Sequence, residues 1–236
     1  MESHNILEYG EFISSVRQNR DSKFGFLLGA GTSLSSGVQS ASDCIWDWKR
    51  EIYCRYNENH RINFPDARSK FAKSQIQKWL DAQGGYPALG AEEEYVFYAE
   101  KAHPIASDRV RYFNSLIHDK VPYVGYRLLC LLNKYLIVES VWTTNFDGMA
   151  ERAAHQMNIT PKVITLDNQQ DIYRTISNTE LMCISLHGDY KYSTLKNTSS
   201  ELDNQSEVFC QVMTYYFTTR HLVVLGYSGR DNSLMS

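Results

Sequence analysis

The chain has 236 residues, of which 43% are hydrophobic and 13% aromatic, and its net charge is −3. Length and composition suit one globular domain with a sizeable core, and this charge balance does not indicate a broad nucleic-acid-binding surface. The apolar runs are too short to cross a bilayer, and the N-terminus lacks the basic and apolar regions of a secretory signal. The five cysteines are scattered and none form CxxC, so we expect reduced thiols, a cytoplasmic location and no zinc ribbon, with Cys130 and Cys183 as small core residues.

The first half of the chain is helical in pattern around a single strand. Residues 24–37 read FGFLLGAGTSLSSG, an apolar run that stops at glycines, which predicts a buried parallel strand and then a tight loop. Apolar residues at three- and four-residue spacing predict an amphipathic helix over residues 6–16, ahead of this strand. Ser40 or Ser42 is expected to cap the next helix, with an apolar face of Ile45, Trp48, Ile52 and Tyr56.

Further helices are predicted at residues 69–82, 92–101, 107–119 and 126–135. The first of these is expected to turn four side chains inward: Phe71, Ile76, Trp79 and Leu80. Because no convincing strand occurs in this region, we predict a helical module at about residues 41–120.

Strands return in the second half and alternate with helices. Strands are predicted at residues 136–142, 162–166, 181–186 and 221–225, and helices at 149–157 and 206–219. This alternation predicts an α/β fold, a Rossmann-like parallel sheet flanked by helices, with right-handed crossovers. The core would comprise residues 1–40 and 121–236, with the helical module inserted in place of any zinc ribbon.

Four of the predicted strands end in polar or glycine clusters: GAGTS at 29–33, TTNFD at 143–147, HGD at 187–189 and GYSGRD at 226–231. Ligands of open α/β sheets bind at the carboxyl ends of the strands, so the four clusters predict one site. Each cluster alone has a structural explanation. The glycines suit a turn, Asn145 and Asp147 suit a helix N-terminus, a single His187 suits a backbone partner, and Ser228 and Asp231 suit turns. These explanations must all hold at once, and they do not explain why every cluster follows a strand.

The glycine loop by itself is a weak signal. It lacks the Lys-Ser or Lys-Thr pair of a phosphate-binding loop, and the third glycine position of the dinucleotide fingerprint holds Leu34. The four clusters in combination, however, resemble the NAD-binding core of the sirtuin family. They are most similar to the sirtuin-like domains that degrade NAD in bacterial anti-phage defence proteins.

The resemblance implies a role for each matching residue. The pyrophosphate would be held by Gly29, Ala30, Gly31 and Ser33, with Thr32 in the same loop and Thr144 also in the cofactor-binding set. The adenosine half would be approached by Gly226, Tyr227 and Ser228.

The resemblance also implies the catalytic residues. Asn145 would position a water or a hydroxyl of the nicotinamide ribose, Asp147 would accept a hydrogen bond from the nicotinamide carboxamide, and His187 would be the general base. Departure of nicotinamide develops positive charge at the ribose, which fixed dipoles stabilise, and an imidazole takes up a proton near neutral pH.

The chain departs from the sirtuin pattern in three places. It lacks the four zinc-binding cysteines of sirtuin deacylases, so no metal is expected. Gln39 replaces the Pro expected after the Ser-Gly pair, and the chain stops at Ser236, before a further helix and strand of the family. We therefore expect the N-terminal part of a longer protein that carries a C-terminal sensor or regulatory domain.

The function expected from this resemblance is hydrolysis of NAD to nicotinamide and ADP-ribose, in a defence effector that forms a homo-oligomer and binds neither membrane nor nucleic acid. Three alternatives stay open. A protein deacylase or ADP-ribosyltransferase is disfavoured by the missing zinc module, and a non-catalytic NAD or ADP-ribose sensor is disfavoured by the set Asn145, Asp147 and His187. A structural assembly domain would also suit the sixteen tyrosines and four tryptophans.

Overall fold

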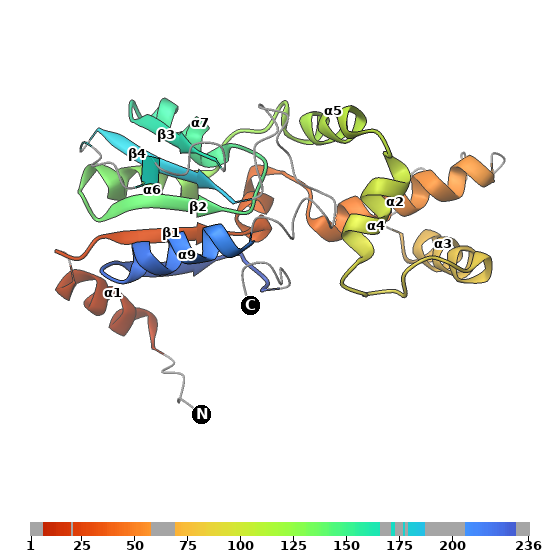
Figure 1. Cartoon of the computed structure of the whole chain (residues 1–236), viewed down its shortest axis with the longest axis horizontal. Coiled ribbons are helices and arrows are strands. Elements are labelled where there is room, and N and C mark those ends of the chain that lie inside the picture. The colour runs from red at the N-terminus through yellow and green to blue at the C-terminus, as the bar shows by residue number, and fades with distance from the viewer. Residues whose placement is uncertain are drawn as a thin grey trace.

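A computed structural model shows a parallel sheet beside a helical module (Figure 1). The structure describes the following residues, with 206–210 described for their backbone only: 7–19, 21–57, 69–165, 171–172, 177, 179–186 and 206–229. Within these ranges, no helix is both long enough and apolar enough to cross a membrane.

The sheet has five strands in the order β3-β4-β2-β1-β5, and all neighbouring strands run parallel. The strands are β1 (Phe24–Leu28), β2 (Val138–Thr143), β3 (Thr160–Ile164), β4 (Glu180–Ser185) and β5 (His221–Leu225). The predicted α/β class with a Rossmann-like parallel sheet is therefore confirmed. The predicted strand positions are also correct to within about two residues at each end.

Helices cover both faces of the sheet, as a parallel sheet requires. One face of the strands packs on α6 (Val124–Lys134) and α7 (Met149–Gln156), and the other packs on α9 (Ser206–Phe217). Successive residues of β1 therefore lie in different cores, Leu27 with α9 and Leu28 with α6 and α7. Cys130 and Cys183 are buried in the second of these cores, as predicted.

Two polar residues in the apolar run of β2 have hydrogen-bond partners. Glu139 accepts hydrogen bonds from Arg220 Nε at 2.6 Å and from Tyr216 OH at 3.1 Å. Ser140 Oγ accepts a hydrogen bond from the indole nitrogen of Trp142 at 3.0 Å. Polar groups are therefore accommodated in a buried strand because each one is hydrogen-bonded.

The helix ahead of β1 forms as predicted, as α1 (Tyr9–Gln18), but none of its residues is buried. Its apolar side chains are half-buried or exposed, and Tyr9 is 80% exposed. Periodicity correctly predicted the helix, whereas its packing depends on neighbouring surfaces.

The helical module comprises α2 (Ala41–Tyr56), α3 (Lys70–Gln83), α4 (Glu94–Ala102) and α5 (Ala106–Ile117). Ser40, rather than Ser42, caps α2: its Oγ accepts from the Asp43 amide at 3.1 Å, and the Asp43 carboxylate accepts from the Ser40 amide at 3.3 Å. This reciprocal pair satisfies backbone donors that have no partner within the helix.

Two residues predicted to face inward are instead exposed. Tyr56 and Phe71 are each 68% exposed. The buried face of α3 follows Ala72, Ile76 and Leu80, and Phe71 lies about 100° around the helix from Ala72. Tyr56 is the last residue of α2, beyond the end of the buried Trp48–Ile52 face.

The centre of the module is a buried ion pair. Lys49 is fully buried, and its Nζ donates to Glu94 Oε1 and, at 2.9 Å, to Gln77 Oε1. The same ammonium lies 4.6 Å from the ring centroid of Trp46 and 4.8 Å from that of Tyr98. Together with Gln77, the ion pair joins three helices, because Lys49 lies in α2, Gln77 in α3 and Glu94 in α4.

Candidate active site at the switch in strand order

The candidate site lies at the carboxyl edge of the sheet, where the order of the strands switches. From β1 the sheet extends on one side through β2, β4 and β3, and on the other side only to β5. Crevices at such switch points are the usual ligand sites of open α/β sheets. Within the described residues, the clusters after β1 and β2, and residues 226–229 of the cluster after β5, follow strands that end at this edge.

Glycines allow the ends of β1 and β5 to touch. The Gly29 amide donates to Leu225 O, and the Gly31 amide donates to Gly226 O, both at 2.9 Å. A Cβ atom added to Gly29 would lie 2.5 Å from Gly226 O, and one added to Gly226 would lie 2.5 Å from the Thr32 amide nitrogen. Gly226 also has a φ of +61°, a left-handed conformation that favours glycine.

The segment after Gly29 is a 3₁₀ helix, Ala30–Ser36, rather than the expected loop. Its first i to i+3 hydrogen bond runs from the Thr32 amide to Gly29 O at 3.0 Å. The amides of Gly29, Gly31 and Thr32 thus have partners inside the protein. Pyrophosphate binding by this segment stays a prediction.

Five side chains from three elements form a hydrogen-bonded group at this edge, here called the polar cluster: Thr32, Ser33, Tyr126, Asn145 and Asp147. Asn145 Nδ2 donates to Gly29 O at 3.0 Å and to Ser33 Oγ at 3.1 Å. The Tyr126 hydroxyl lies 2.8 Å from Ser33 Oγ and 3.1 Å from Thr32 Oγ1. Ser33 Oγ donates its only proton to Asp147 Oδ2, so it accepts from both Tyr126 and Asn145.

The two predicted catalytic residues that follow β2 are both buried. The backbone amide of Asn145 donates to Thr143 Oγ1 at 2.9 Å, and its side-chain Nδ2 donates to Gly29 O. An amide fixed through Nδ2 presents its Oδ1 on the opposite side of the group. Gly148 is the N-cap of α7, and Asp147 Oδ1 accepts from the amide of Met149, the first residue of that helix, at 3.0 Å. The expectation that Asp147 suits this helix N-terminus is therefore confirmed.

Tyr126 was missed by sequence reasoning, because it lies in a leucine-rich helical run and has the spacing of a core residue. A single tyrosine with a polar tip in the first turn of that helix was the only available signal. Burial, and then the charge of Asp147, raises the pKa of Tyr126 to about 12, so its hydroxyl stays protonated at neutral pH.

A small cavity of about 10 Å³ lies beside the polar cluster, room for about one water molecule. Its polar lining comes from Thr143, Asn145, Asp147, Glu151 and Ser185. This cavity is far smaller than a nucleotide, so it is not a nucleotide pocket.

The remaining predicted site residues divide into two groups. Thr144 is half-buried and its amide donates to Leu28 O at 3.2 Å, while Gly226, Tyr227 and Ser228 follow β5 directly. His187 and Asp231 lie outside the described residues. Among the residues that the structure places, no three His, Cys, Asp or Glu side chains come together in a way that could hold a metal ion.

A family model described as SIR2-like domain matches residues 139–236. The match begins within β2 and includes Asn145, Asp147, His187 and the residues after β5. No curated protein matches the chain significantly. A SIR2-like domain is compatible with the use of NAD. The parallel α/β sheet fits this match, and residues 139–236 are therefore similar to a SIR2-like domain.

Proposed function

We propose that the protein is an NAD glycohydrolase that cleaves NAD into nicotinamide and ADP-ribose. The observation that carries the proposal is the polar cluster, in which Asn145 and Asp147 after β2 meet Ser33 after β1 at the switch point. The similarity of residues 139–236 to a SIR2-like domain supports the same substrate.

The geometry supports a role for four members of the cluster. Asn145, held on its Nδ2 side, offers its carbonyl oxygen to a ribose hydroxyl or to the attacking water. Ser33 donates a hydrogen bond to the Asp147 carboxylate, and Tyr126 is hydrogen-bonded to Ser33. The carboxylate is thereby held to accept from the nicotinamide carboxamide and to place a negative charge near the reacting ribose. Fixed charges and dipoles of this kind stabilise the positive charge that develops as nicotinamide leaves. His187 completes the proposal as general base, on the strength of the sequence resemblance.

The direct test is to incubate the purified protein with NAD, without any acyl-lysine peptide, and to measure nicotinamide by chromatography. We expect release by the wild type and a loss of about 10²-fold or more in His187→Ala, the usual scale for a general base. His155→Ala is the control, because His155 is exposed in the last turn of α7.

The outcomes separate the alternatives. Release of nicotinamide only when an acetylated peptide is present would favour a deacylase and refute the proposal. Binding of NAD without turnover would favour the sensing module.

We also propose that this activity is metal-independent and belongs to a cytoplasmic, homo-oligomeric defence effector with a C-terminal sensor domain. The resemblance of the four clusters to NAD-degrading effectors supports these finer points. They predict no effect of a chelator on activity, an oligomer in light scattering, and loss of phage resistance in cells that carry His187→Ala.

A further inference from the structure

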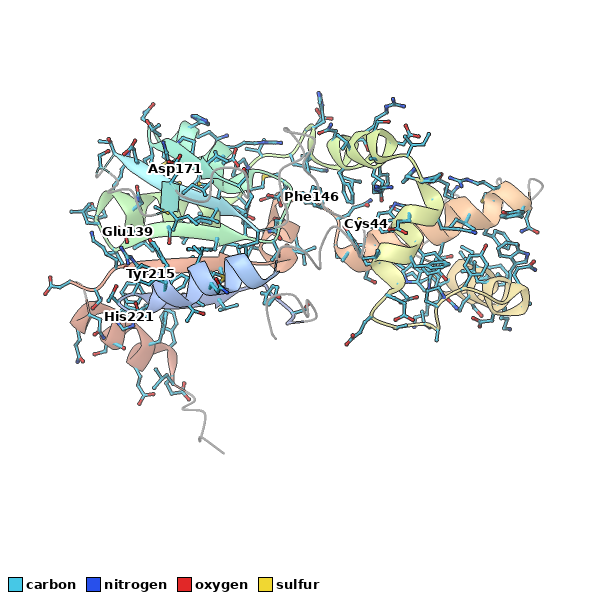
Figure 2. All side chains as sticks on the ribbon, in the orientation of Figure 1. Cys44, Glu139, Phe146, Asp171, Tyr215 and His221 are labelled. Atoms are coloured by element: carbon cyan, nitrogen blue, oxygen red, sulfur yellow. The ribbon has the colours of Figure 1, made fainter. Side chains whose placement is uncertain are left out.

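Phe146 lies between the two candidate catalytic residues but packs on the helical module. Its ring centroid is 4.3 Å from that of Phe113 in α5, with the ring planes at 56°. Phe146 packs both against the core between the sheet and helices α6 and α7 and against the core of the module. Leu116 likewise packs against both cores. Figure 2 labels Phe146 at the boundary between the two parts.

Helix α5 connects the two cores along its length. Phe113 is fully buried in the core of the module, where it packs edge-on against Trp48 at 6.2 Å. Ile117, about one turn further along, is fully buried in the core that α6, α7 and the sheet form. A rotation or shift of α5 would therefore disturb both cores at once.

A second contact ties the end of α5 to the helix that follows the site. Arg152 of α7 donates from Nη1 to Ile117 O at 3.1 Å and to Lys120 O at 3.0 Å. Ile117 is the last residue of α5 and Lys120 follows it by three residues; a cation is favourable at such a helix C-terminus. The segment from Phe146 to α7, which contains Asp147, is thus attached to α5 at both of its ends.

We propose that α5 sets the geometry of Asn145 and Asp147 through the contact between Phe113 and Phe146. Both phenylalanines are then positioning residues for the nucleotide site, and this inference rests on the proposed function. Packed cores resist continuous deformation, so a displaced Phe146 ring moves the backbone that carries its two neighbours. Small misplacements of catalytic groups lower turnover strongly.

The test compares Phe113→Leu with Phe97→Leu. Phe97 of α4 is half-buried and packs against the same module core, with its ring 5.8 Å from that of Tyr86 and 5.3 Å from that of Tyr98. Both substitutions remove an aromatic ring from that core, but only Phe113 contacts Phe146. Because Phe113 is fully buried and Phe97 is half-buried, the thermal stability of each variant is measured as well, and the site readouts are compared relative to that loss.

The first readout needs no catalysis. NMR hydrogen exchange reports on the Asn145 and Met149 amides, which donate to Thr143 Oγ1 and to Asp147 Oδ1. We expect Phe113→Leu to speed exchange of both amides by about tenfold relative to Phe97→Leu, on the scale of local opening. The second readout is NAD cleavage, for which we expect kcat to fall about tenfold in Phe113→Leu with KM nearly unchanged.

Equal exchange and equal kcat in the two variants would overturn the inference. If the wild type releases no nicotinamide, the proposed function fails, and the exchange comparison still decides whether α5 positions the site. If Phe113→Leu does not fold, Phe146→Leu removes the same ring contact from the other side. In the double variant Phe113→Leu/Phe146→Leu, the changes in exchange rate and kcat should be smaller than the sum of the two single effects, because both substitutions remove the same ring contact. Additive effects would contradict the inference.

Discussion

Replacing Gly226 by alanine tests whether the crossing of β1 and β5 requires glycine. The new Cβ would lie 2.5 Å from the Thr32 amide nitrogen and 2.9 Å from the Gly31 carbonyl carbon, and both are backbone atoms. Backbone atoms cannot swing aside as a flexible side chain does, so one of the two segments must shift.

Two costs add in this variant. The left-handed backbone of Gly226 costs an alanine about 1–2 kcal/mol, and forcing a methyl group into a filled space costs about 1–3 kcal/mol. The free energy of unfolding should fall by about 2–5 kcal/mol, which corresponds to a decrease in Tm of roughly 5–20 °C for a chain of this size.

Urea denaturation followed by circular dichroism measures this loss, with Gly125→Ala as the matched control. A Cβ at Gly125 has nothing within 4 Å, and Gly125 lies in α6, so this variant should be as stable as wild type or up to about 1 kcal/mol more stable. If the free energy of unfolding of Gly226→Ala lies within about 0.5 kcal/mol of the wild-type value, the range of ordinary surface substitutions, the contact between the ends of β1 and β5 does not require glycine.

Two further predictions concern buried polar groups. Lys49→Met should destabilise the protein by about 3–5 kcal/mol in urea denaturation, because Glu94 is left buried without its cation. The double variant Lys49→Met/Glu94→Leu should recover most of that loss. If the losses of the two single variants simply add in the double variant, this account is contradicted. The pKa of Tyr126 is about 12 in the folded state and near 10 in the unfolded state. The stability that this difference contributes is therefore fully present below pH 10 and is lost as the pH rises from 10 to 12. In thermal melts between pH 10 and 12, the wild type should therefore lose stability relative to Tyr126→Phe, by up to about 1.4 kcal/mol per pH unit. If stability falls with pH equally in the two proteins, the raised pKa of Tyr126 is refuted.

The sequence alone determined the elements and the class of the fold. The helical spacing of apolar residues correctly predicted α1 to α7, and the short apolar runs correctly predicted the strands, because both patterns follow from local backbone geometry. Alternation of strands and helices implied a parallel sheet, so all four clusters, including the one at 187–189, were expected at one edge. The structure confirms that edge for the clusters it describes.

Only the tertiary structure decided which groups meet. The strand order places β5 directly beside β1, and this contact, rather than any ligand, already accounts for the glycines at 29, 31 and 226. Tyr126 joins the polar cluster through the packing of α6 on β2, and Phe71 is exposed because the facing helices contact Ala72 instead. Periodicity determines the spacing of residues along one element, whereas the partner of each face depends on contacts between segments distant in the chain, which no local pattern encodes.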